Sequence, residues 1–177
     1  LGHRQVAHLM MPLRHDSPTG LATVEDLAAA EFADTRDRAL GFLDVFGDGV
    51  RESGTPRLAQ TAIPDVEQGA IAARLLLDAP VAQRPTAIVA QSDLLAMGVI
   101  RAAEDLGLSV PDDLSVTGFD GVELPWFAGT LTTIDQHGLA KGRLMGEMLR
   151  QLLDGDRPDD AVQPTDLRVG TTTSPAR

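Results

Sequence analysis

Short strand-like runs alternate with helix-like stretches along most of this 177-residue chain, and this alternation limits its fold more than any other feature. The β-branched and aliphatic runs are at residues 5–11, 58–63, 86–90 and 114–117. Apolar residues at helical spacing occupy the stretches between them. Strands that alternate with helices form βαβ units, so the sequence predicts an α/β fold with a mostly parallel open sheet and helices on both faces.

Capping residues and glycines predict where several helices begin and end. N-caps are expected at Asp34 or Thr35, at Asp65 and at Ser92, and the glycines in residues 47–49 are expected to end the first of these helices. The remaining predicted elements are an alanine-rich helix at residues 24–32, a strand at 131–134, a helix at 138–153 and a β-rich segment at 165–172.

Polar residues follow two of the predicted strands. Ser92 and Asp93 come directly after the strand at 86–90, and Asp120 belongs to the GFDG sequence that is predicted to end the strand at 114–117. The carboxyl ends of parallel strands meet at one edge of the sheet, where open α/β sheets bind their ligands. We therefore expect these side chains to face a small-molecule crevice.

Composition argues against several classes of function. The formal net charge is −11, and no run of Lys or Arg opposes it, so the surface should repel nucleic acid and anionic membrane. Cysteine is absent and the four histidines lack metal-binding spacing, so neither a metal nor a cofactor is expected. No glycine-rich phosphate-binding motif, nucleophile elbow or membrane-spanning run is present.

A set of short motifs, found in one order along nearly the whole chain, resembles the LacI/GalR family of transcriptional regulators. The motifs are LGHRQVA at residues 1–7, RALGF at 38–42, SDLLAMG at 92–98, VPDDLSVTGFD at 110–120 and LTTIDQ at 131–136. The resemblance implies a two-lobed effector-binding core of the periplasmic-binding-protein type behind an amino-terminal helix-turn-helix domain.

The same resemblance predicts how the chain is divided between the two lobes. Residues 1–134 match the carboxyl-terminal lobe, residues 135–155 match a crossover helix that belongs to the other lobe, and residues 156–177 match a return segment. The DNA-binding domain and most of the amino-terminal lobe are expected to lie outside this sequence.

Five residues are the effector contacts that the resemblance implies: Arg38, Ser92, Asp93, Asp120 and Gln136. Ser92 stands where the family usually has Asn, and its capping role is sufficient to explain it. Asp93 and Asp120 have simpler alternatives as a residue of a first helical turn and an Asx turn. A sugar is the expected effector, with a purine or a phosphorylated sugar as alternatives.

The predicted function is effector sensing and dimerisation in a cytoplasmic repressor, which would reach operator DNA only through its helix-turn-helix domain. A solute-binding component of a sugar transporter is the alternative, and an enzyme with an acid–base pair of carboxylates, Asp93 and Asp120, ranks third. The helix at 138–153 carries an apolar stripe that would be bare and could pack on a second chain. The residues that match the family's dimer surface are Val66, Ala70, Met97, Ile100, Arg101, Trp126 and Phe127.

Overall fold

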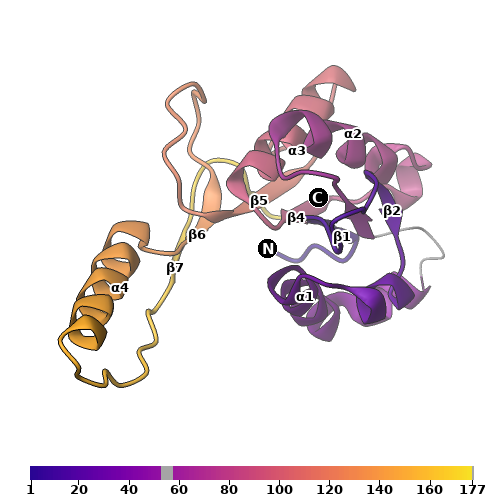
Figure 1. Ribbon diagram of the computed structural model, residues 1–177. Helices are drawn as coiled ribbons and strands as arrows, with labels where there is room; N and C mark the ends of the chain where they lie inside the picture. The colour runs from indigo at the N-terminus through magenta and orange to yellow at the C-terminus, as the bar shows by residue number, and fades with distance from the viewer. Residues whose placement is uncertain (53–57, 177) are drawn as a thin grey trace.

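The computed structural model describes residues 1–52 and 58–176, and within them a single seven-stranded sheet (Figure 1). The strand order is β2-β3-β1-β4-β5-β6-β7. All pairs from β3 to β6 are parallel, and only the edge strands β2 and β7 run antiparallel to their neighbours. The strands are β1 (Val6–Met10), β2 (Gly20–Ala22), β3 (Leu58–Gln60), β4 (Ala87–Ala90), β5 (Ser115–Asp120), β6 (Thr132–Asp135) and β7 (Asp166–Arg168).

Helices cover both faces of the sheet, which confirms the predicted α/β class. Helix α1 (Ala33–Glu52) lies on one face, while α2 (Val66–Leu77) and α3 (Asp93–Asp105) lie together on the other (Figure 1). Two short 3-10 helices, at Glu25–Ala29 and Val81–Gln83, complete this part of the chain.

The alternation of side chains along β1 divides the interior into two cores. Ala7 and Leu9 pack under α2 and α3, whereas Val6 and Met10 pack with Phe42 under α1. Successive residues of a strand point to opposite faces, so a strand that is buried on both sides is mainly apolar, and a polar residue such as His8 in β1 needs hydrogen-bond partners. This explains why the predicted strands read as continuous apolar runs.

Close approach of α2 and α3 depends on glycine. A Cβ atom at Gly98 would lie 2.6 Å from the backbone oxygen of Val66 and 2.6 Å from the backbone nitrogen of Ala70. The two helices therefore meet backbone to backbone at this point, and only a residue without a side chain fits between them.

Several predicted boundaries are wrong, and tertiary packing explains the largest error. Helix α1 begins at Ala33, before either predicted cap, and continues to Glu52 through the glycines at residues 47–49. Phe42 and Phe46 bury part of this helix against the sheet, and that packing outweighs the weak helix propensity of glycine.

Smaller differences concern the strands and the first short helix. Strand β5 extends to Asp120, which pairs with Asp135 of β6, so the GFDG sequence does not end the strand at residue 117. The predicted helix at residues 24–32 is a 3-10 helix of five residues, and the edge strand β2 was not predicted.

Helix α4 (Gly138–Leu153) stands apart from the sheet and none of its residues is buried (Figure 1). Its bounds are those predicted from the sequence. The apolar stripe is exposed, with Met145 at 65% and Leu153 at 79% of their full accessibility. Within residues 1–52 and 58–176, no helix is both long enough and apolar enough to cross a membrane.

Candidate functional site

Strand β1 is the point at which the chain reverses the direction in which it adds strands to the sheet. The polar groups discussed below lie near this switch point. The chain leaves β1 through α1 to reach β3 on one side, and β4 pairs with β1 on the other side. In doubly wound sheets, ligands bind outside the carboxyl ends of the strands at such a switch point. Arg38 reaches it from α1, because its Nη1 donates to the carbonyl oxygen of Gln91, 2.9 Å away, directly after β4.

The guanidinium of Arg38 also lies 4.1 Å from the centre of the Phe119 ring in β5. This cation–π contact and the Gln91 hydrogen bond hold the side chain across β4 and β5. Among the described residues, Arg38 forms no ion pair, so its positive charge can still attract a ligand. We call the edge of the sheet at the carboxyl ends of β4, β5 and β6, where Arg38 lies, the rim.

Asp120 ends β5 in an unusual backbone conformation. Its φ is 131°, a region that residues other than glycine seldom adopt, at a cost of about 1–3 kcal/mol. One carboxylate oxygen accepts a hydrogen bond of 2.7 Å from Nε2 of Gln136. Burial raises the pKa of Asp120, as does the nearby charge of Asp93, while Gln136 and Arg38 act in the opposite direction.

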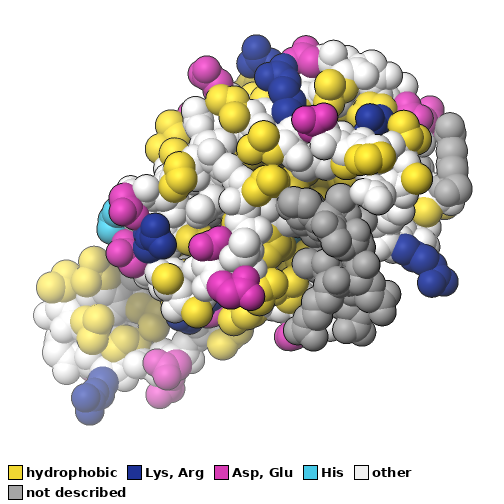
Figure 2. Space-filling view, turned by 90° about the vertical axis from the view of Figure 1, so that its right-hand side faces the viewer, with side chains coloured by type: hydrophobic (Ala, Val, Ile, Leu, Met, Phe, Trp, Pro, Cys, Tyr) yellow, Lys and Arg dark blue, Asp and Glu magenta, His cyan; other side chains and the backbone are white. Residues whose placement is uncertain are grey.

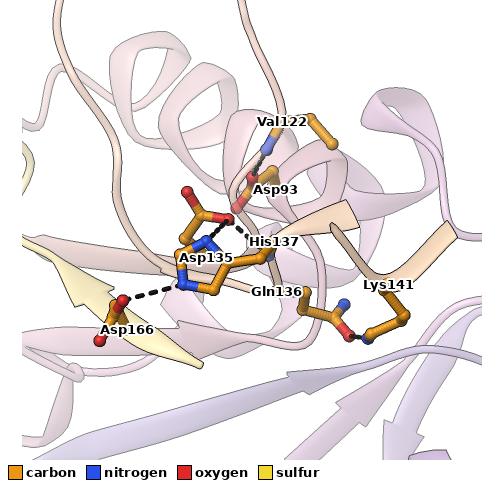
Figure 3. Close-up of polar contacts among 7 residues, drawn as sticks. All are labelled: Asp93, Val122, Asp135, Gln136, His137, Lys141 and Asp166. Atoms are coloured by element: carbon orange, nitrogen blue, oxygen red, sulfur yellow. Dashed lines mark hydrogen bonds and ion pairs between the residues drawn. The ribbon is translucent and has the colours of Figure 1, made fainter. Parts of the chain in front are cut away.

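Gln136 is held from both ends of its amide group. Its nitrogen donates to Asp120, and its oxygen accepts a hydrogen bond of 2.8 Å from the ammonium of Lys141 in α4 (Figure 3). Because an ammonium can only donate, this contact fixes which side of the amide faces Asp120. The result is a chain of hydrogen bonds from α4 to the carboxyl end of β5.

Ser92 and Asp93 hold the elements next to these residues in place. The Ser92 hydroxyl caps α3 by accepting from the backbone nitrogen of Leu95. Asp93 is fully buried, and its two oxygens accept from the Thr133 hydroxyl and from the backbone nitrogen of Val122, at 2.8 Å for the latter (Figure 3). Its carboxylate thus ties α3 to β6 and to the turn after β5.

Gly118 is required for this arrangement. A Cβ atom there would lie 2.3 Å from an oxygen of Asp93 and 2.8 Å from the Leu131 side chain. The absence of a side chain in the middle of β5 therefore makes room for the buried carboxylate.

A pocket of about 380 Å³, lined in part by Arg38, lies between α1 and the strands β5 and β6. Its walls are mainly apolar, with Phe42, Phe46, Phe119 and Ile134 among them. His8 lies at the same place, stacked on Phe42 with ring centres 4.7 Å apart.

The imidazole of His8 belongs to a buried hydrogen-bond network. Its Nδ1 donates to the Val89 carbonyl at 2.9 Å, and its Nε2 accepts from the Gln91 amide at 3.0 Å, which is the neutral tautomer. Burial lowers the pKa of His8 to about 4. His8 is therefore a neutral structural side chain at physiological pH.

His137 occupies the connection between β6 and α4. Its φ is 51°, and its ring lies 2.8 Å from a carboxylate oxygen of Asp166 and 3.6 Å from one of Asp135 (Figure 3). These contacts link α4 to β6 and β7. No group of three His, Asp or Glu side chains that could hold a metal occurs in residues 1–52 and 58–176.

The structure brings together three of the five predicted site residues. Arg38, Asp120 and Gln136 lie at the rim. The Ser92 oxygen accepts from the Leu95 backbone instead, and both Asp93 oxygens accept hydrogen bonds from the protein. Lys141 was missed by sequence reasoning. Its position as the sole lysine of the chain, five residues after Gln136, was a signal that could have found it.

The seven residues predicted for the dimer surface differ in their exposure. Ala70 and Ile100 are buried in the core under α2 and α3. Arg101 and Trp126 are exposed, and the remaining three are partly buried. On the face shown in Figure 2, Lys and Arg side chains stand singly or in small groups among acidic and hydrophobic ones.

Comparison with known proteins gives consistent matches over nearly the whole chain. The profile of the periplasmic binding protein-like domain matches residues 1–173. The HTH-type transcriptional regulator IpsA of Corynebacterium glutamicum is 32% identical over 177 residues, which cover 98% of this chain and 48% of that protein.

Solved structures agree with this relationship. A LacI-family transcriptional regulator from Corynebacterium glutamicum superposes with a TM-score of 0.84 at 31% identity, over 98% of this chain and 51% of that one. The lac repressor dimer bound to operator and an anti-inducer gives 0.69 at 25% identity, over 98% and 54%. The chain thus spans about half the length of these relatives.

Proposed function

Because the chain belongs to the periplasmic binding protein-like domain family, in the form carried by LacI-family transcriptional regulators, we propose that it senses a small-molecule effector for a DNA-binding repressor. The single observation that supports this most is the rim at the switch point of the sheet. There Arg38 and Gln136 supply donors and Asp120 supplies an acceptor, all at the carboxyl ends of the strands.

A hydroxyl-rich effector fits this mixture of groups. A hydroxyl both donates and accepts, so it is recognised best where a carboxylate stands beside amide and guanidinium donors. We assign Arg38, Asp120 and Gln136 to effector contact, with a carbohydrate as the expected class. Ser92 and Asp93 hold the rim in place through the α3 cap and the bonds to Thr133 and Val122.

Helix α4 is the element that would carry the signal. We assign residues 1–134 to one lobe, residues 135–155 to a crossover whose helix packs on a second lobe, and residues 156–177 to the return. The exposed apolar stripe of α4 supports this division. Effector binding would then favour a closed arrangement of two lobes and shift how paired helix-turn-helix domains sit on operator DNA in the cytoplasm.

The two other functions considered from the sequence have less support. A solute-binding transport component is disfavoured because the relatives are HTH-type regulators. An enzyme that uses Asp93 and Asp120 as an acid–base pair is disfavoured because Asp93 is fully buried and both its oxygens are bonded within the protein.

The test is a calorimetric titration of the chain with a panel of sugars, sugar phosphates and purines. We expect one class to bind and Asp120→Ala to weaken that binding about 10- to 100-fold, the usual scale for a hydrogen bond to a charged group. Glu123→Gln, which removes an exposed carboxylate three residues away, is the matched control. If Asp120→Ala left every affinity unchanged, Asp120 would not be an effector contact.

A further inference from the structure

Lys141 is the only lysine among the 177 residues, and the fold places it beside the candidate effector site. It lies in the first turn of α4, partly buried, with its ammonium 2.8 Å from the Gln136 oxygen (Figure 3). Among the described residues it forms no ion pair. Although the chain has 26 acidic residues, the part that the structure describes offers this cation no carboxylate within ion-pair distance.

The hydrogen bonds among Lys141, Gln136 and Asp120 leave N–H groups of the first two residues unused. An ammonium has three N–H groups and a primary amide has two, so after the bonds to Gln136 and Asp120 two N–H groups remain on Lys141 and one on Gln136. Arg38 adds further donors on the side of β5. A ligand group rich in acceptors would satisfy these donors better than a neutral hydroxyl would.

The electrostatics at the start of α4 also favour an anionic group near Lys141. A cation in the first turn of a helix opposes the helix dipole, and the two carboxylates at this end, Asp135 and Asp166, contact His137. His137, at the N-cap, makes no side-chain capping hydrogen bond. An anion held by Lys141 would remove this unfavourable interaction.

We infer that Lys141 is a specificity-determining residue that binds an acidic group, a phosphate or a carboxylate, on a hydroxylated effector. This inference depends on the proposed function and narrows it from sugars in general to acidic sugar derivatives. Asp120 and Arg38 recognise hydroxyls in this scheme, while Lys141 recognises the charge. Gln136 connects the two parts because its amide bonds to both Asp120 and Lys141.

The single lysine makes a direct test possible. Reductive methylation of the chain with ¹³C-formaldehyde labels only Lys141 and the amino terminus, and the dimethylated amine keeps its charge and one N–H group. The Lys141 resonance is followed by NMR as glucose 6-phosphate, glucuronate, glucose or inorganic phosphate is added. The amino-terminal resonance at Leu1 serves as the reference within the same molecule.

We expect an acidic sugar to shift the Lys141 resonance and to bind the unlabelled chain about tenfold more tightly than glucose does. The difference between glucose 6-phosphate and glucuronate identifies the acidic group. Lys141→Met should abolish the preference for the acidic sugar and Lys141→Arg should keep it. Arg143→Met, which removes an exposed cation from the same helix, should leave it unchanged.

Other outcomes contradict different parts of the scheme. Glucose binding as tightly as its acidic derivatives, with no effect of Lys141→Met, would overturn this inference and leave the proposed function standing. An equal response to inorganic phosphate alone would overturn the role of the hydroxyl contacts. If neither the acidic sugars nor glucose bound, the proposed carbohydrate effector and this inference would both be wrong.

Discussion

His8 is held in its neutral form by the residues around it. Its ring is stacked on Phe42, its Nδ1–H is bonded to the Val89 carbonyl, and its Nε2 faces the amide N–H of Gln91. A proton on Nε2 would place two N–H groups against each other inside the protein. This geometry agrees with the direction of the pKa, which burial lowers to about 4 from the ordinary 6.5.

The His8 pKa predicts how stability depends on pH. Below pH 6.5 the unfolded chain binds a proton at His8, while the folded chain does not until about pH 4. The free energy of unfolding should therefore fall as the pH is lowered across this window, by about 3 kcal/mol from this residue. Urea unfolding at several pH values measures the slope.

Two variants distinguish the contribution of His8 to this pH dependence from the contribution of carboxylates in the same pH range. His8→Gln should fold less stably at pH 7 yet lose much of the pH dependence between 6.5 and 4. His15→Gln, at an exposed histidine, should keep the full slope. An unchanged slope in His8→Gln would show that other groups are responsible.

At the scale of elements, the contact between α2 and α3 depends on a missing side chain. Gly98→Ala would place a methyl group 2.6 Å from backbone atoms of α2, so the helices must separate. We expect a loss of about 1–3 kcal/mol in the free energy of unfolding. Denaturant unfolding of the two proteins measures it.

Gly146 offers a matched control in α4, a helix without buried residues. Apart from its chain neighbours and the adjacent helix backbone, a Cβ atom there would have no atom within 4 Å. Gly146→Ala should therefore stabilise α4 slightly, by about 0.5–1 kcal/mol at most, through helix propensity alone. Equal effects of the two substitutions would contradict the close packing of α2 on α3.

At the scale of the whole molecule, the sheet domain is well covered but α4 is not. Several large apolar side chains of α4 are exposed, among them Leu139, Met145 and Leu153, and a large exposed apolar surface favours association. We predict that the chain is a dimer at micromolar concentration, with α4 of one copy packed on the other.

Sedimentation of variants tests this assembly. Met145→Glu combined with Leu149→Glu should shift the chain towards the monomer, because charge would replace the apolar stripe. Trp126→Ser, on the other exposed surface considered for dimerisation, should leave the dimer intact. A monomeric wild-type chain would contradict the prediction, and dissociation by Trp126→Ser alone would assign the contact to that surface.

Elements that are defined by interactions between residues close together in the sequence were predicted well. Asp65 and Ser92 cap their helices through bonds to residues three positions away, and α4 has the bounds that its spacing predicted. Helix α1 was bounded wrongly because its glycines at residues 47–49 suggested an end. Residues of α1 up to Phe46 pack with β1, which lies far away in the sequence, and no local pattern showed that contact.

The candidate site shows the same division. The resemblance to the LacI/GalR family placed Asp120, Arg38 and Gln136 among the expected effector contacts. For Asp120, its position after a predicted strand favoured the same assignment. Sequence reasoning could not distinguish Asp93, whose carboxylate is consumed by Thr133 and Val122, from a side chain that faces a ligand. It also missed Lys141, although this sole lysine follows Gln136 by only five residues; the turn from β6 into α4 brings its ammonium to the Gln136 oxygen.

The alternation of strands and helices thus determined, from the sequence alone, the parallel sheet and the edge at which polar groups gather. Periodicity and capping act between near neighbours, so they can be read without coordinates. Tertiary structure alone decided which of those groups keep free hydrogen-bonding capacity and which are buried as supports. That distinction depends on contacts between residues far apart in the chain, and no local pattern encodes them.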